Sequence, residues 1–501
     1  MWANVIRCLR LGALKEEHLD RRLAACEAAI GAILLVTFIV ARDLPMVDLP
    51  QHAAQIAVWF NLGKPEYHSD QFVLNLRTPY LLAYLVANVL ASAVGVIAAL
   101  KLVIWLAVVG QVLGLHFLCK QLGHDPRLAL LGLPLALGYT FLFGFVSYIV
   151  AMPFLYLCVG LAASYAARPS LTVGAMLVAA LLAVLLSHGF AFAQSMFFVG
   201  PLLMFGKGPI GLRAMPLLVP IAVAAAWLLP GTVGTRLGVD TWEPGLGRLV
   251  SLPGMLVGSG SKDIAASVYG FILIALFALT FGRPVLTAGR LLPGVFVLLG
   301  FCMFPEMHRG YSLLWQRFAM LVVPALLLAF RPGGEVGHKL ALGRRAAIFG
   351  AVALWLGIFE FRLSKFNQET AGFHAMVNSL PRGLRIRPLV FDAESEAFPD
   401  LPTFTHLPAY YLVDKGGMQG YSFAIYPSSA IRYRNGIGAK MNGGQEWQPE
   451  AFRADAELHD YDCFMVHSKK DRYQQLFGTI GEAVRVRAYA MDWWSYCARI
   501  D

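Results

Sequence analysis

The sequence predicts an α-helical polytopic membrane protein with a small α/β domain at its C-terminus. Of its 501 residues, 57% are hydrophobic and only 14% are charged, which is too few charges for the surface of a soluble protein of this size. Charged residues are sparse from Leu23 to Phe330 and frequent from Lys365 to Asp501. This change in composition predicts a domain boundary near Phe361–Phe366.

Twelve apolar runs are candidates for crossing a bilayer that is about 30 Å thick. They are Leu23–Ala41, Tyr80–Ala99, Leu102–Leu118, Leu128–Phe143, Val146–Ala166, Leu171–Leu186, Phe190–Phe205, Ala214–Leu229, Ile264–Phe281, Leu291–Phe304, Phe318–Phe330 and Ala346–Phe361. The first run follows a basic segment, residues 1–22, and is too long for the apolar part of a cleavable signal peptide. We therefore expect a retained anchor helix with a cytoplasmic N-terminus.

The basic residues assign the remaining loops to the two sides of an inner (plasma) membrane, because membrane proteins keep most Lys and Arg residues in the cytoplasm. Counted back from the C-terminus, they put residues 23–361 in a membrane domain and residues 366–501 in an extracytoplasmic domain. A cytoplasmic N-terminus then requires an odd number of crossings. We expect Tyr80–Ala99 to lie partly in the interface or to re-enter the membrane, which leaves eleven crossings; an unrecognised thirteenth span is the alternative. The net charge of +10 is explained by these loops and does not indicate nucleic acid.

The first outer loop, residues 42–78, contains the leading candidate for chemistry. Asp48 and His52 are four residues apart and would share one face of a helix over Leu49–Leu62, whose apolar spacing suits the membrane interface. Asp48 is then a general base or a metal ligand, assisted by His52. The alternative is that Asp48 only caps the helix and His52 is a solvated interfacial residue.

Two later outer segments contain candidates for substrate binding. His188 ends an apolar run, where an imidazole can contact a polar ligand or simply reach the interface. Glu306, His308, Arg309 and Arg317 follow in the second segment. An arginine on the outer side opposes the usual charge bias and indicates an anionic partner such as a phosphate. Headgroup binding, or an ion pair with Glu306, is the alternative.

The C-terminal region reads as a small α/β domain. Strands are expected at Pro388–Asp392, Tyr461–His467 and Ala483–Ala490, and a helix is expected at Asp471–Phe477. The domain contains Cys463 and Cys497, which could form a disulfide in an oxidising compartment, although their spacing alone does not establish one.

This arrangement resembles the GT-C superfamily of integral membrane glycosyltransferases. The shared features are an acidic residue in the first outer loop, an interfacial helix behind it, many apolar helices and a soluble C-terminal outer domain. The segments FGFVSYIVAMPF (143–154), SHGF (187–190) and LLWQRFAMLVVPALLL (313–328) look like those of uncharacterised bacterial members.

The resemblance implies a sugar donor carried on a polyprenyl phosphate or pyrophosphate, and transfer to an acceptor at the outer face, usually with inversion. It implies that Asp48 is the catalytic base and that Arg317 and Arg309 hold the lipid phosphate. The sequence departs from several GT-C families because its second outer loop, near Phe143–Tyr148, has no acidic residue. We therefore predict no obligatory cofactor or metal, and a divalent ion beside Asp48 stays an alternative.

Two other functions are compatible with the composition. A lipid or polysaccharide transporter would show inverted repeats and charges at the middle of the membrane, whereas most charges here flank the apolar runs. A non-catalytic protein of envelope assembly would work through its C-terminal domain. The sequence has no P-loop and no GxGxxG, HExxH or CxxC motif, which argues against nucleotide chemistry within this chain.

Overall fold

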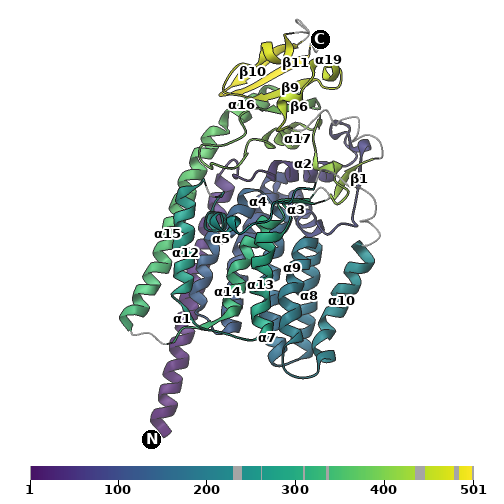
Figure 1. Cartoon of the computed structure of the whole chain (residues 1–501). Helices are drawn as coiled ribbons and strands as arrows, with labels where there is room; N and C mark the ends of the chain where they lie inside the picture. Colours follow the sequence, from purple (N-terminus) through teal and green to yellow (C-terminus); the bar gives the residue numbers. More distant parts are fainter. Residues whose placement is uncertain are drawn as a thin grey trace.

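A computed structural model of the chain describes residues 2–228, 240–260, 262–308, 311–334, 338–434, 446–478 and 484–498. Most helices stand side by side in a bundle, and the C-terminal sheet lies over one end of it (Figure 1). The N-terminal end of α1 projects from the opposite end of the bundle (Figure 1).

The helical segments account for all twelve apolar runs. Among the described residues, five segments are long and apolar enough to cross a membrane: Arg21–Val40, Val96–Leu122, Val146–Ala167, Ile210–Trp227 and Leu340–Ser379. Seven shorter apolar segments complete the set. The helices of the bundle are α1 (Trp2–Val40), α3 (Leu81–Val94), α4 (Val96–Leu122), α5 (Gly132–Ala136), α6 (Tyr139–Leu142), α7 (Val146–Ala167), α8 (Leu171–Ser187), α9 (Gly189–Met204), α10 (Ile210–Leu228), α11 (Leu252–Val257), α12 (Ile264–Ala278), α13 (Ala288–Met303), α14 (Val322–Ala329) and α15 (His338–Glu369).

Helix α4 runs antiparallel to α1. His116 Nδ1 lies 2.7 Å from Glu27 Oε1 near one end of the pair, and Lys101 Nζ donates to the carbonyl of Arg42 at the other end. Helix α4 therefore begins at the end of the bundle where α1 finishes. Helix α3 has only 14 residues, or about 21 Å at 1.5 Å per residue, and breaks from α4 at Gly95. The expected re-entrant segment thus starts and finishes at the same end of the bundle.

The amphipathic segment after Asp48 forms α2 (Leu49–Phe60), as the spacing predicts. It lies between the bundle and the C-terminal sheet (Figure 1), so its polar face is covered instead of facing a lipid headgroup layer. Gln51 is buried, accepts the N–H of Phe423 through Oε1 and donates through Nε2 to the carbonyl of Tyr421. Farther along the first outer loop, strand β1 (Phe72–Leu74) pairs antiparallel with β8 (Ile431–Tyr433) of the C-terminal domain.

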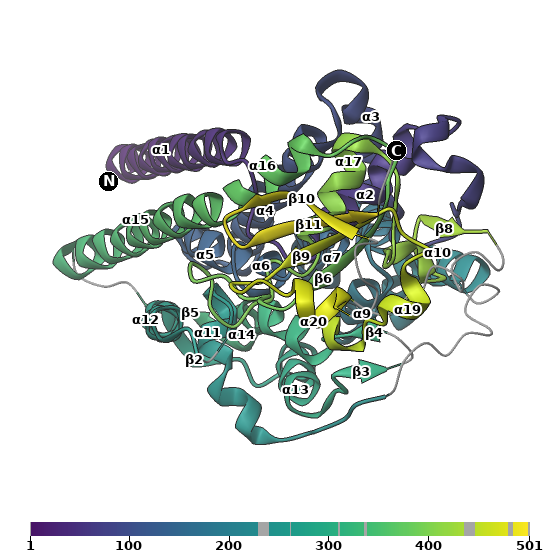
Figure 2. The ribbon, with the colours of Figure 1, turned by 90° about the horizontal axis from the view of Figure 1, so that it is seen from above.

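The C-terminal domain contains a five-stranded mixed sheet with the order β10-β11-β9-β6-β7. Strands β6 (Arg385–Val390), β9 (Cys463–His467) and β10 (Val484–Ala490) match the three predicted strands, and α20 (Tyr473–Phe477) matches the predicted helix. Strands β7 (Met418–Gln419) and β11 (Trp493–Ala498) were not anticipated. Helices α16 (Ala371–Ser379), α17 (Tyr410–Lys415) and α19 (Ala454–Glu457) complete the domain. Seen from above, the sheet lies across the bundle (Figure 2).

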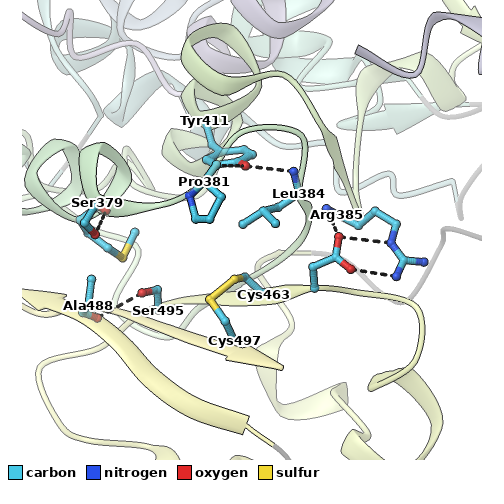
Figure 3. Close-up of a disulfide and its surroundings, with 11 residues drawn as sticks. Ser379, Pro381, Leu384, Arg385, Tyr411, Cys463, Ala488, Ser495 and Cys497 are labelled. Carbon is cyan, nitrogen blue, oxygen red and sulfur yellow. Dashed lines mark hydrogen bonds and ion pairs between the residues drawn. A yellow bond between two sulfur atoms is a disulfide. The ribbon is translucent and has the colours of Figure 1, made fainter. Parts of the chain in front are cut away.

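The two cysteines of this domain form a disulfide. Cys463 on β9 and Cys497 on β11 are opposite each other in the antiparallel pairing of the two strands, and their side chains are bonded (Figure 3). The bond joins the middle of the sheet across 34 residues of sequence. The cysteines described within the apolar helices, Cys26, Cys119, Cys158 and Cys302, are free.

Candidate active site

Asp48 occupies the N-cap position of α2, but its side chain makes no capping hydrogen bond. Its backbone is held from the other side, because the N–H groups of Val47 and Asp48 donate to the carbonyls of Leu142 and Phe143, at 3.0 and 3.1 Å. The simple capping interpretation of Asp48 therefore does not describe the structure. The carboxylate stays free for another partner, and its side chain keeps 15% of its accessible surface.

The second outer loop packs against Asp48 through Gly144. This glycine has a φ of +88°, and a Cβ at this position would lie 2.6 Å from the backbone nitrogen of Asp48. Only glycine adopts this conformation without strain and leaves room for the aspartate backbone. The loop has no carboxylate of its own, but it fixes the position of the one that follows the first helix.

The C-terminal domain supplies a charged neighbour of Asp48, His406, together with the carboxylate that holds it. His406 Nε2 lies 3.7 Å from Asp48 Oδ1, and His406 Nδ1 lies 2.5 Å from Glu446 Oε2. The imidazole is between the two carboxylates, so the three groups form a chain and do not converge on one point. Within the described ranges, no three His, Cys, Asp or Glu side chains are grouped in a way that could hold a metal ion.

The environment of Asp48 changes its acidity. Burial raises the pKa of Asp48 from its ordinary 3.8 to about 7, while the positive charges of His406 and Arg317 oppose this rise and the negative charge of Glu446 adds to it. A carboxylate with a pKa near the working pH is a stronger base than an exposed one and is still ionised in a large fraction of molecules. The site therefore suits removal of a proton from a hydroxyl group.

His52 is held as a neutral ring. Its Nδ1 lies 2.6 Å from the hydroxyl of Tyr84, and it also forms a hydrogen bond with the backbone of Gly144. Burial, together with the charge of His406, lowers the pKa of His52 to about 3. Both contacts join α2 to neighbouring elements. The geometry therefore indicates that His52 helps to hold Asp48 in position and does not act as an acid.

Arg317 lies beside the same loop and has an uncompensated charge. Its guanidinium carbon is 4.0 Å from the ring centroid of Phe145, the residue after Gly144. Its donors reach the carbonyls of Leu313 and Ser312, at 3.3 and 3.4 Å. In the described part of the chain, no carboxylate lies within ion-pair distance of it. A largely enclosed arginine without an acidic partner is costly, which indicates an anionic ligand.

His188 orients Arg317 at this point. Its Nε2 lies 2.9 Å from Nη1 of Arg317, and because a guanidinium can only donate, Nε2 accepts this hydrogen bond. His188 is also the N-cap of α9, where its Nδ1 lies 3.2 Å from the backbone nitrogen of Ala191. The contact with His188 fixes one arm of the guanidinium and leaves its other N–H groups available to an anion.

The other predicted residues of the late outer segment are placed differently. His308 is exposed, and its Nδ1 lies 3.2 Å from Asp240 Oδ2 in an exposed ion pair. Glu306 accepts a hydrogen bond from Gln316 and interacts electrostatically with Tyr139, as Arg317 and Asp48 also do. Arg309 lies outside the described residues. The structure thus brings Asp48, His52, His188 and Arg317 into one region, with Glu306 near its edge.

Sequence reasoning missed His406 and Glu446. Both come from stretches of the C-terminal domain without regular periodicity, so nothing in the local pattern marks them. The second outer loop has no acidic residue, whereas the C-terminal domain contributes one, Glu446, which contacts Asp48 through the imidazole of His406.

Comparison with known proteins supports the fold. No family model matches the chain, and no curated protein sequence matches it. Among solved structures, the chain is similar to ArnT from Cupriavidus metallidurans, crystallised with bound undecaprenyl phosphate, with a TM-score of 0.52 and 11% sequence identity. The match covers 94% of this chain and 97% of that chain. The predicted architecture of an integral membrane protein with several spans and a C-terminal sheet is therefore confirmed.

Proposed function

We propose that this protein is an integral membrane glycosyltransferase that transfers a sugar from a polyprenyl-phosphate-type donor to an acceptor at the outer face of the inner membrane. The main observation behind this proposal is that Asp48 and Arg317 lie in one site. Asp48 is a carboxylate suited to act as a base, and Arg317 has no carboxylate within ion-pair distance among the described residues. The likeness in fold to ArnT, which was crystallised with bound undecaprenyl phosphate, supports this assignment.

The chemistry follows from the positions of these two groups. Asp48 accepts the proton of the acceptor hydroxyl, the acceptor oxygen attacks the anomeric carbon, and the bond between that carbon and the phosphate oxygen breaks. The lipid phosphate leaves with the bonding electrons. Arg317, oriented by its hydrogen bond to Nε2 of His188, stabilises the charge that develops on it, in the manner of an oxyanion site.

The outer placement of the site rests on two features. The C-terminal domain and the first outer loop lie at the end of the bundle opposite the basic N-terminus, which the positive-inside bias assigns to the cytoplasm. The Cys463–Cys497 disulfide is typical of an oxidising compartment.

Binding of undecaprenyl phosphate by the purified protein in lipid nanodiscs tests the proposal without knowledge of the sugar. We expect the wild type to bind and Arg317→Gln to lose most of the affinity. Arg77→Gln is the matched control, because Arg77 is another arginine of the outer loops that donates to backbone carbonyls, those of Ala226 and Trp227. Equal affinity of wild type and Arg317→Gln would contradict the proposed phosphate site.

A further inference from the structure

The outer domain reaches directly to Asp48. The residue before the short helix Leu407–Ala409 is His406, and this helix packs against α2. Gln51, three residues after Asp48, makes two hydrogen bonds to the backbone of the same domain. The position of His406 relative to Asp48 is therefore fixed by a packed interface and not by a free loop.

The imidazole of His406 has little freedom to rotate. Its side chain keeps only 7% of its accessible surface, and its ring stacks on Tyr421 with centroids 5.5 Å apart and planes 10° apart. Phe423 and Trp447 contact the same ring edge-on. The ring plane that these contacts fix points one nitrogen at each carboxylate.

The two nitrogen contacts determine the charge of the ring. Nδ1 donates to Glu446, whose side chain is fully buried, and Nε2 faces the oxygen of Asp48. A neutral imidazole carries one N–H, so its other nitrogen would direct a lone pair at one of the carboxylates. An imidazolium carries two N–H groups and can donate a hydrogen bond to each carboxylate. Burial alone would lower the pKa of His406, but the two carboxylates outweigh burial and raise it above its ordinary value.

We infer that Glu446 and His406 are a positioning pair through which the C-terminal domain completes the active site and controls the protonation state of Asp48. Glu446 holds the imidazolium in place, and the imidazolium favours the ionised form of the carboxylate that acts as the base. The assignment of Asp48 as the base rests on the proposed function; the electrostatic control does not.

Other groups that face these residues modify the effect without replacing it. Around Asp48 the remaining charge is that of Arg317, which acts in the same direction as His406. The neutral titratable groups nearby are His52, Tyr84, Tyr139, Tyr421 and Tyr426. Arg387 acts on Glu446 from within the outer domain and helps to keep it ionised.

The test is an infrared titration of the Asp48 carboxyl group in the full-length protein in lipid vesicles, with the Asp48→Asn spectrum subtracted. In His406→Gln we expect the midpoint to rise by about one pH unit, because an opposite charge at this distance depresses a carboxyl pKa by about that amount. Glu446→Gln should raise the midpoint by a smaller amount. The substitution disfavours the imidazolium form of His406, which raises the midpoint, but it also removes the negative charge of Glu446, which lowers it. Circular dichroism verifies that each variant is folded.

The matched control is His374→Gln. His374 also belongs to the outer domain and also pairs with an aspartate of the first outer loop, with Nε2 2.8 Å from Asp43 Oδ2, but it does not contact Asp48. Its loss should leave the midpoint of Asp48 unchanged. An unchanged midpoint in both His406→Gln and Glu446→Gln would overturn the inference. This outcome is distinct from failure of the proposed function, which would appear as normal sugar transfer by Asp48→Asn.

Discussion

Two aspartates, five residues apart in the first outer loop, each face a histidine of the C-terminal domain, but their surroundings differ. Asp43 is fully engaged: its carboxylate lies 2.8 Å from His374 Nε2, and its backbone N–H and carbonyl both bond to the side chain of Asn367. Asp48 has no capping bond, and its histidine is 3.7 Å away. The first arrangement satisfies a buried charge and joins two domains; the second leaves a carboxylate open to a substrate.

Substitution of the two aspartates by asparagine should affect activity to very different extents. Asp48→Asn removes the base, and we expect transfer to fall by about 10²–10⁴-fold, the range typical of a lost general base. The measurement is sugar transfer by protein reconstituted in vesicles, at equal amounts of folded protein. Asp43→Asn should retain most of its turnover per folded molecule. Normal transfer by Asp48→Asn would remove this residue from the mechanism.

The same two variants should differ in sign when stability is measured. Asp43→Asn disrupts the buried contact between Asp43 and His374 and should lower the free energy of unfolding by about 1–3 kcal/mol, the typical cost of a buried polar group that loses its partner. Asp48 has a folded pKa of about 7, above its ordinary value of 3.8, so its ionisation destabilises the fold progressively as the pH rises through this window. Asp48→Asn should therefore melt at a higher temperature than wild type at pH 8. Thermal unfolding followed by tryptophan fluorescence distinguishes these outcomes, and a lower melting temperature for both variants would contradict the contrast.

The pH dependence of transfer should report Asp48. Since the ionised form is the base, the rate should rise as the pH increases through about 7 and fall about tenfold for each pH unit below this midpoint. The check is the pH profile of turnover at saturating donor. A rate that is independent of pH between 5 and 8 would show that another group accepts the proton.

Gly144 offers a finer test of how the base is positioned. Gly144→Ala places a methyl group against the backbone of Asp48 and adds the strain of a positive φ, an effect on the order of 1–3 kcal/mol. Gly63 in the first outer loop also has a positive φ, of +92°, but a Cβ there would meet no atom within 4 Å. We expect lower turnover in Gly144→Ala than in Gly63→Ala, measured per folded protein. Equal turnover would show that the second outer loop does not fix Asp48.

The sequence predicts the elements of the fold well, because the energetic signals involved are local. Apolar runs of bilayer length mark the helices of the bundle, and the spacing after Asp48 marks α2. What it could not predict is that α2 is buried on both faces. Gln51 and Gln55 are polar by composition, but the outer domain, more than 300 residues later in the chain, covers them.

Of the proposed site, the sequence predicted only the residues that come from residues 23–361, and none of those from the C-terminal domain. Asp48 follows the first helix, and the predicted topology places Arg317 on the side where arginine is uncommon, so each is recognisable from its own position in the sequence. His406 and Glu446 have no such local signal. They lie 358 and 398 positions after Asp48 in the sequence, and only the folded chain brings them close to it. His308 differs from both: the sequence predicts it as a substrate-binding residue of the same segment as Arg317, and in the structure it is exposed, with its Nδ1 3.2 Å from Asp240 Oδ2.

The most direct measurement is a structure of the protein in lipid nanodiscs with undecaprenyl phosphate added. We predict density for the phosphate in contact with the Arg317 guanidinium, and facing the carboxylate of Asp48 across the space that the sugar and the acceptor hydroxyl would occupy. Phosphate density elsewhere on the bundle, or a packed side chain between Asp48 and Arg317, would contradict the proposed catalytic site.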